Sequence, residues 1–309
     1  MKHSIKVTAI LITVFLITQL IGIAVISYYN ISENALPYGM EPPSEIRPKP
    51  FDLPFQILLS FLIAISLFFI LTQIKAEGFI RFWFFAVTIL ALGISLNVVF
   101  SSVDFIYSSI IAFIVAIPFA FVKIYKRNIL VHNLTELLIY PGIAAVFVPI
   151  LNILGIIILL LIISLYDIWA VWYSEFMQKM ANYQINNLKF FTGFFIPYAS
   201  KKEKQKIKKI KQKYEKKSKK DLENKFKKAK IKVNLAILGG GDIIFPIITA
   251  GVFIKVFNSI IPGLVISLFS TIALFTLFFL ARKGKFYPAM PFLTIGIYLA
   301  MIFNWLFVV

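Results

Sequence analysis

ILGIIILLLIISLYDIWAVWYSEF, residues 153–176, is an almost unbroken apolar run that carries one carboxylate, Asp167, well inside it. The hydrocarbon core of a membrane is about 30 Å thick and needs about 20 apolar residues per helix, so this segment is long enough to span it. A later run, residues 233–257, also holds a single interior carboxylate, Asp242. Apolar segments of this length determine the architecture of the chain. Two of them carry an aspartate inside the hydrocarbon core, where a charge costs free energy.

The rest of the 309-residue chain repeats this apolar pattern. It is 60% apolar and only 15% charged, whereas soluble domains are about 25% charged, so the composition indicates a membrane protein. The first run is too long for a signal peptide and lacks a small-residue cleavage site, so we expect it to be retained. The sequence predicts an all-α integral membrane protein with nine transmembrane helices, at residues 7–27, 54–75, 79–99, 105–122, 130–151, 153–176, 233–257, 260–281 and 289–309.

Positive charge is concentrated in alternate connections, which predicts the orientation. The segment 177–232 alone has about 19 lysines against about four acidic residues. By the positive-inside rule we expect a cytoplasmic N-terminus and an external C-terminus in the cell membrane. We therefore expect the chain to have three parts: a six-span bundle at 1–176, a lysine-rich cytoplasmic loop at 177–232 and a three-span part at 233–309.

The lysine-rich loop has two interpretations. It is either a solvated linker or, in part, a basic amphipathic helix on anionic headgroups, with Ile207, Ile210 and Tyr214 on its apolar face. The net charge of +18 comes largely from this loop and not from a compact basic domain. It therefore does not indicate nucleic-acid binding.

Several hydrolytic chemistries are excluded by composition. The chain has no cysteine and only two histidines, His3 and His132. Thiolate catalysis, zinc-thiolate sites and the His-Glu-x-x-His metalloprotease pattern are therefore absent. A Gly-x-Ser-x-Gly elbow is also missing. We expect neither a cofactor nor a metal.

Asp167 and Asp242 are the acidic residues that lie well inside predicted spans, with Glu136 a borderline case in the fifth. Each costs roughly 2.5–3.5 kcal/mol at a helix centre. Counting from the span ends puts both about 14 Å below the cytoplasmic face, on consecutive antiparallel helices. Two close carboxylates share one proton where the dielectric constant is low, and such a pair can activate water against a peptide bond.

The pair alone leaves other functions open. Intramembrane carboxylates also serve ion channels or leaks and proton-coupled transporters. The residues around the aspartates favour hydrolysis. Asp242 ends Gly239-Gly240-Gly241-Asp242, where glycines allow close backbone approach or simply helix packing.

Two further motifs accompany the aspartates. Tyr166 precedes Asp167 and either donates a hydrogen bond or packs. Pro288-Ala289-Met290-Pro291 opens the last span, where two prolines remove backbone donors and leave carbonyls unpaired near the aspartates, unless they merely start the helix.

Together these residues resemble the presenilin/signal peptide peptidase family of intramembrane aspartyl proteases, and archaeal presenilin homologues in particular. The likeness rests on Tyr166-Asp167, on Gly239 to Asp242, on Pro288-Ala289-Met290 and on the nine-span layout. Family members usually have leucine where this chain has Met290, a side chain of similar volume that preserves the role. The lysine-rich loop favours the presenilin orientation over that of signal peptide peptidases.

The resemblance implies a presenilin-like fold and an aspartic endopeptidase that cuts single-span transmembrane helices within the lipid bilayer. It implies no cofactor and no obligatory partner subunit, and it leaves a homo-oligomer open. Asp167 and Asp242 would be the catalytic pair. The residues that would bind substrate or shape the site are Tyr166, Gly239, Gly240, Gly241, Pro288, Ala289, Met290 and Pro291.

Overall fold

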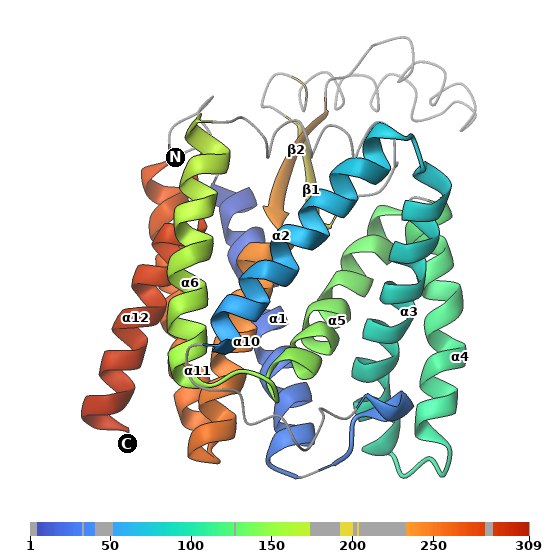
Figure 1. The fold of residues 1–309 in the computed structure, drawn as a ribbon, viewed down its shortest axis with the longest axis horizontal. Coiled ribbons are helices and arrows are strands. Elements are labelled where there is room, and N and C mark those ends of the chain that lie inside the picture. The colour runs from blue at the N-terminus through green and yellow to red at the C-terminus, as the bar shows by residue number, and fades with distance from the viewer. Residues whose placement is uncertain are drawn as a thin grey trace, which may run out of the picture.

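The fold is a bundle of long helices capped at one end by a small sheet (Figure 1). The computed structural model describes residues 5–32, 34–40, 52–126, 128–173, 192–199, 203, 233–281 and 287–308. Its long helices are α1 (Ile5–Asn30), α2 (Asp52–Gln73), α3 (Glu77–Ser101), α4 (Ser108–Phe121), α5 (Ile129–Phe147), α6 (Ile153–Ile168), α10 (Gly240–Phe257), α11 (Ile260–Leu280) and α12 (Met290–Phe307).

These helices confirm the multi-pass membrane architecture. Eight of them are long and apolar enough to cross a membrane, and α2, at 22 residues, completes the predicted layout within the described ranges. Short π-helical turns extend α4 over Val122–Lys126 and α6 over Trp169–Tyr173. Many large apolar side chains on the outer faces are exposed, as expected of helices that face lipid.

Helix α1 lies centrally and packs against α5, α10 and α11. Helices α3 and α4 pair beside α5, while α12 lies against α6 and α11. Helix α2 contacts α6 and α3 and crosses the bundle diagonally in Figure 1. At the tightest crossing, a Cβ on Gly142 of α5 would lie 1.9 Å from the Ala91 carbonyl oxygen of α3, so only glycine fits there.

The sheet joins β1 (Gly193–Ala199) and β2 (Val233–Gly239) as antiparallel strands, with Gly193 opposite Gly239. It lies at the upper end of the bundle in Figure 1, and β2 leads directly into α10. The span predicted over 233–257 is therefore wrong at its start, because residues 233–239 are a strand and the helix begins at Gly240. Gly239, which is extended, is about 1 kcal/mol worse than alanine in a helix and precedes the first helical residue, while Gly240 and Gly241 form the first turn.

The sheet has a buried face and an exposed face. Phe194, Ala236 and Leu238 are buried in the main core, whereas Leu235 and Ile237 are 42% and 37% exposed. This two-residue alternation was hidden in the sequence because both faces are apolar. Strand β1 lies within the segment predicted as a lysine-rich loop, and the amphipathic helix considered there, with Ile207, Ile210 and Tyr214, falls outside the described residues.

Lys255 ties the opposite end of α10 to the connection between α5 and α6. Its Nζ donates to the carbonyl oxygens of Val148, Pro149 and Leu151, at 2.9, 3.1 and 2.6 Å. These are carbonyls at and beyond the end of α5, which lack partners within that helix. Helices α6 and α10 are therefore joined at the end remote from the sheet.

Candidate active site

Asp167 lies one residue before the end of α6 and is only 8% exposed. Its Oδ2 accepts a hydrogen bond from the backbone N–H of Met290 at 3.0 Å, and the backbone of Ala289 also binds this carboxyl. Met290 is the first residue of α12, so the positive end of that helix faces the aspartate. Backbone donors at a helix start are a common way to hold a carboxylate.

Asp242 is the third residue of α10 and is partly buried. Its carboxyl turns back to the backbone of Gly239, the residue that precedes the helix, as in one half of a capping box. Asp167 and Asp242 are close enough to act on each other electrostatically. Two aspartates far apart in the sequence are thus brought near each other, one beside the junction of α6 with its π-helical turn and one in the first turn of α10.

The glycines before Asp242 differ in their surroundings. A Cβ on Gly240 would lie 2.8 Å from the Tyr140 hydroxyl oxygen, and one on Gly239 would lie 3.2 Å from Oδ2 of Asp242. A Cβ on Gly241 would meet no atom closer than 4.0 Å, and this residue is exposed. Gly239 and Gly240 therefore permit close packing, whereas a side chain at Gly241 would approach only Phe245 outside its own turn.

The motif Pro288 to Pro291 lies where α12 begins. Pro288 and Met290 are buried, and Pro291 occupies the second helical position, where a missing N–H costs no hydrogen bond. Among the described residues just before α12, the non-helical backbone covers 287–289, and the Ala289 carbonyl already accepts from the Leu293 N–H at 3.1 Å. The second proline starts the helix and does not break it.

A row of hydrogen bonds fastens α12 to α6 below Asp167. The hydroxyls of Ser164 and Thr294 are 2.6 Å apart, and the Tyr298 hydroxyl donates to the Ile157 carbonyl at 2.7 Å. With Met290, these contacts recur every fourth residue of α12 and follow one face of that helix. Sequence reasoning missed Thr294 and Tyr298, although their spacing from Met290 was a visible signal.

Two other residues near the aspartates lie on helices that are distant from them in the sequence. Tyr140 of α5 packs against Gly240 and lies within electrostatic reach of Asp242. Gln19 of α1 donates from Nε2 to the Ile243 carbonyl at 3.0 Å, directly after Asp242. Tyr166, which the sequence singled out, is half-buried with its ring 6.1 Å from that of Trp169.

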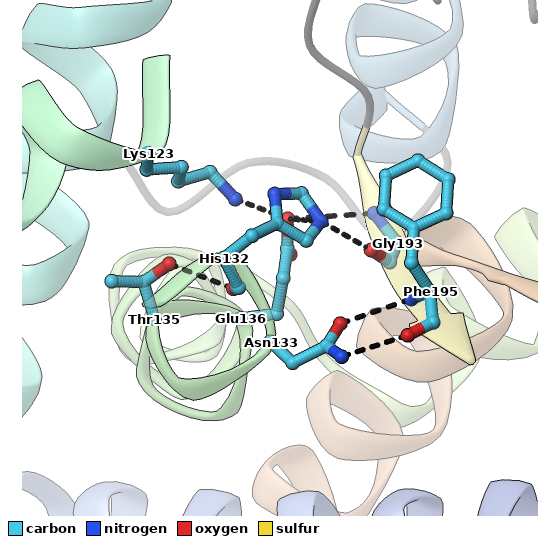
Figure 2. Close-up of polar contacts among 7 residues, drawn as sticks. All are labelled: Lys123, His132, Asn133, Thr135, Glu136, Gly193 and Phe195. Atoms are coloured by element: carbon cyan, nitrogen blue, oxygen red, sulfur yellow. Dashed lines mark hydrogen bonds and ion pairs between the residues drawn. The ribbon is translucent and has the colours of Figure 1, made fainter. Parts of the chain in front are cut away.

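Glu136, the borderline case, is buried within α5 at 1% exposure. Its Oε1 pairs with the Lys123 ammonium and lies 3.5 Å from Nε2 of His132, as Figure 2 shows. The charge is therefore compensated locally by Lys123. Among the described residues, no group of three His, Cys, Asp or Glu could hold a metal ion.

Comparison with known proteins gives a consistent result. Residues 12–308 match the family described as signal-peptide peptidase, presenilin aspartyl protease. No curated protein sequence matches the chain.

Two solved structures share the fold. One is a presenilin family intramembrane aspartate protease in space group C222, with 17% identity over 97% of this chain and 98% of that one and a TM-score of 0.59. The other, also titled a presenilin family intramembrane aspartate protease, in space group P2, has 16% identity over 96% of each chain and a TM-score of 0.58.

Proposed function

Because this chain belongs to the family of signal-peptide peptidases and presenilin aspartyl proteases, we propose that Asp167 and Asp242 hydrolyse peptide bonds within single-span transmembrane helices. The observation that carries the proposal is that the two carboxyls are close enough to act on each other electrostatically where α6 and α10 pack together. Family membership makes the chain an aspartic endopeptidase of the membrane. It favours hydrolysis over the ion-channel and transporter functions that the pair alone left open.

In the proposed reaction the two aspartates hold one proton between them. The ionised carboxylate takes a proton from a water molecule as the water oxygen attacks the scissile carbonyl carbon. The protonated carboxyl of the other aspartate donates its proton to the carbonyl oxygen. The resulting gem-diol collapses as the C–N bond breaks. The carboxyl that took the proton from water passes it to the departing nitrogen. Asp167 suits the ionised role, because the backbone groups of Met290 and of the preceding Ala289 bind its carboxyl.

The substrate must be extended at the scissile bond, because a helix shields its own peptide groups. Two features support binding of an extended segment. The backbone around Pro288 and Ala289 is irregular, and the outward side of β2 exposes Leu235 and Ile237. We propose that the substrate unwinds and lies as a strand between these two features, next to the exposed Gly241.

The proposed topology follows the charge distribution. The N-terminus and the lysine-rich loop are cytoplasmic and the C-terminus is external, with the protein in the cell membrane. Water reaches the aspartates from the cytoplasmic side. We propose that activity requires no partner subunit, as the resemblance to archaeal presenilin homologues implies.

The test is cleavage of a purified single-span reporter by the purified protein in lipid vesicles. We expect specific fragments that a transition-state analogue of aspartyl proteases suppresses, and loss of cleavage in Asp167→Asn and in Asp242→Asn. Asp104→Asn is the matched control, because Asp104 lies in an exposed turn between α3 and α4. Cleavage that persists in the folded Asp167→Asn or Asp242→Asn protein would rule out the proposed pair.

A further inference from the structure

Side chains of α5 occupy the edge of β1 that faces away from β2 (Figure 2). The Asn133 amide accepts from the Phe195 N–H at 2.9 Å and donates to the Phe195 carbonyl at 2.8 Å. His132 Nε2 lies 2.7 Å from the Gly193 carbonyl oxygen and so carries the proton and donates it. These side chains make the hydrogen bonds that a third strand would make.

The occupied edge determines which side of the sheet remains open. Successive residues of a strand direct their backbone groups to opposite edges, so Gly193 and Phe195 face α5 while Phe194 faces β2. Pro197, the next residue on the α5 side, has no N–H to offer. Within the described residues, the edge left for a further strand is therefore the outward edge of β2, where the side chains of Leu235 and Ile237 are exposed.

A buried charge pair holds this attachment in place. Glu136 Oε1 accepts from Lys123 and lies 3.4 Å from the Gly193 amide nitrogen. Lys123 comes from the π-helical end of α4, so α4, α5 and β1 meet at one carboxylate. The His132 and Phe195 rings also stack, with centroids 5.0 Å apart. Buried polar groups of this kind specify one arrangement more than they add stability.

The attachment leads directly to the candidate catalytic pair. Gly193, held by His132 and Glu136, lies opposite Gly239 in the sheet. Gly239 is the residue whose backbone meets the Asp242 carboxyl three positions later. Any movement of β1 along α5 would therefore move the start of α10 relative to Asp167.

We propose that Asn133, supported by His132 and the Lys123–Glu136 pair, is a positioning residue that fixes the sheet against α5 and so determines which substrate bond is cut. This inference rests on the proposed function, because it concerns the presentation of a substrate strand to Asp167 and Asp242. Asn133 acts through β1 and β2 and need not touch the substrate.

The test compares Asn133→Ala with Asn128→Ala in the full-length protein. Asn128 also lies at the start of α5, but its side chain accepts from Leu130 and Val131 of its own helix. Both variants lose hydrogen bonds of one asparagine, and only the first loses contact with β1. Asn133→Asp keeps an acceptor for the Phe195 N–H and loses the donor to its carbonyl, so its effect should be intermediate.

Two measurements decide the outcome: mass spectrometry of the reporter fragments and hydrogen exchange of the sheet amides. In Asn133→Ala we expect cleavage to spread to neighbouring bonds, kcat/KM to fall about tenfold and exchange in 193–199 and 233–239 to increase. In Asn128→Ala we expect a lower thermal midpoint with unchanged cleavage positions and unchanged sheet exchange.

Unchanged cleavage positions in the folded Asn133→Ala protein would overturn the inference and leave the proposed protease activity standing. Equal effects of Asn128→Ala and Asn133→Ala on cleavage positions would also overturn it, since they would indicate general loosening of α5. If the unaltered protein fails to cut the reporter at all, the proposed function fails with it, whatever the exchange data show.

Discussion

The Met290 N–H and the Asp167 carboxyl are joined by a hydrogen bond of 3.0 Å, which links the start of α12 to the end of α6. The contact brings the Pro288 to Pro291 motif against one member of the candidate catalytic pair. Because the donor is a backbone group, the side chain of Met290 can vary without loss of this bond. The replacement of the usual leucine by methionine is therefore compatible with the arrangement.

The first prediction concerns the hydrogen bonds below this contact. Thr294→Val removes the hydroxyl that meets Ser164 and should cost about 1 kcal/mol of stability, as single hydrogen bonds between membrane helices do. Activity should fall about tenfold as α12 shifts against Asp167, because small misplacements are costly in catalysis. Thermal unfolding and reporter cleavage measure the two effects.

Thr276→Val is the control for that substitution. Its hydroxyl binds only the Ile272 carbonyl of its own helix and is exposed. Thr294→Ser, which keeps the hydroxyl, should restore most of the activity. Equal losses in Thr276→Val and Thr294→Val would contradict a specific role for the α6–α12 contact.

The second prediction separates the glycines before Asp242. Gly240→Ala should lower both stability and activity, because its methyl group would overlap the Tyr140 hydroxyl, and overpacking costs about 1–3 kcal/mol. Gly241→Ala should leave stability unchanged or raise it, since alanine favours the helix, yet reduce activity by adding a methyl group to the exposed first turn of α10 that carries Asp242. Full activity in Gly241→Ala would show that the substrate does not approach this turn.

The third prediction concerns the buried ion pair. Glu136→Gln leaves the Lys123 charge without its partner and should destabilise the protein by about 3–5 kcal/mol, the usual cost of breaking a buried pair. Lys123→Met combined with Glu136→Gln should recover much of that loss, because no buried charge then remains unpaired. Thermal unfolding of the single and double variants tests this, and additive losses would refute the pairing.

The fourth prediction concerns the pH dependence of stability and uses a residue outside the predicted spans. Burial raises the pKa of Tyr38, in the short helix η1 (Pro37–Gly39), to about 12 from the model-compound value of 10.0. Its hydroxyl donates to the Ser109 carbonyl at 3.0 Å, so the folded state prefers the neutral phenol. This contribution to stability is complete below about pH 10 and is lost between about pH 10 and 12.

Tyr38→Phe isolates that contribution. The difference in thermal midpoint between the original protein and this variant should stay constant up to about pH 10 and shrink above it. A difference that is independent of pH up to 12 would show that the Tyr38 hydroxyl does not titrate in this range.

The sequence was sufficient for the helices and for the two aspartates, because both signals are local. A run of about 20 apolar residues can cross the membrane regardless of which other segments it packs against. A carboxylate inside such a run is easily recognised in the sequence. The position of Asp242 in the first turn of its helix could not be predicted in the same way. The estimated depth of Asp242 assumed helix from residue 233, whereas the structure has a strand up to Gly239.

What the sequence could not reveal depends on pairing between distant segments. Strand β1 is paired with β2 across a separation of about 40 residues, and the apolar pattern of 233–239 reads equally well as the start of a helix. The charges of Lys123 and Glu136 identified neither their mutual contact nor the third partner, Gly193. Tyr140 gave no signal, because its proximity to Gly240 is created only by the packing of α5 on α10.

Lys255 gives the two aspartate-bearing helices a pivot. It lies about 20 Å along α10 from Asp242, at a rise of 1.5 Å per residue, and binds the chain just before α6. With that far end anchored, a rotation of about 10° at this radius would separate the carboxyls by about 3.5 Å. An opening wide enough to admit a peptide bond thus needs only a small angular change, without sliding of either helix through the bilayer.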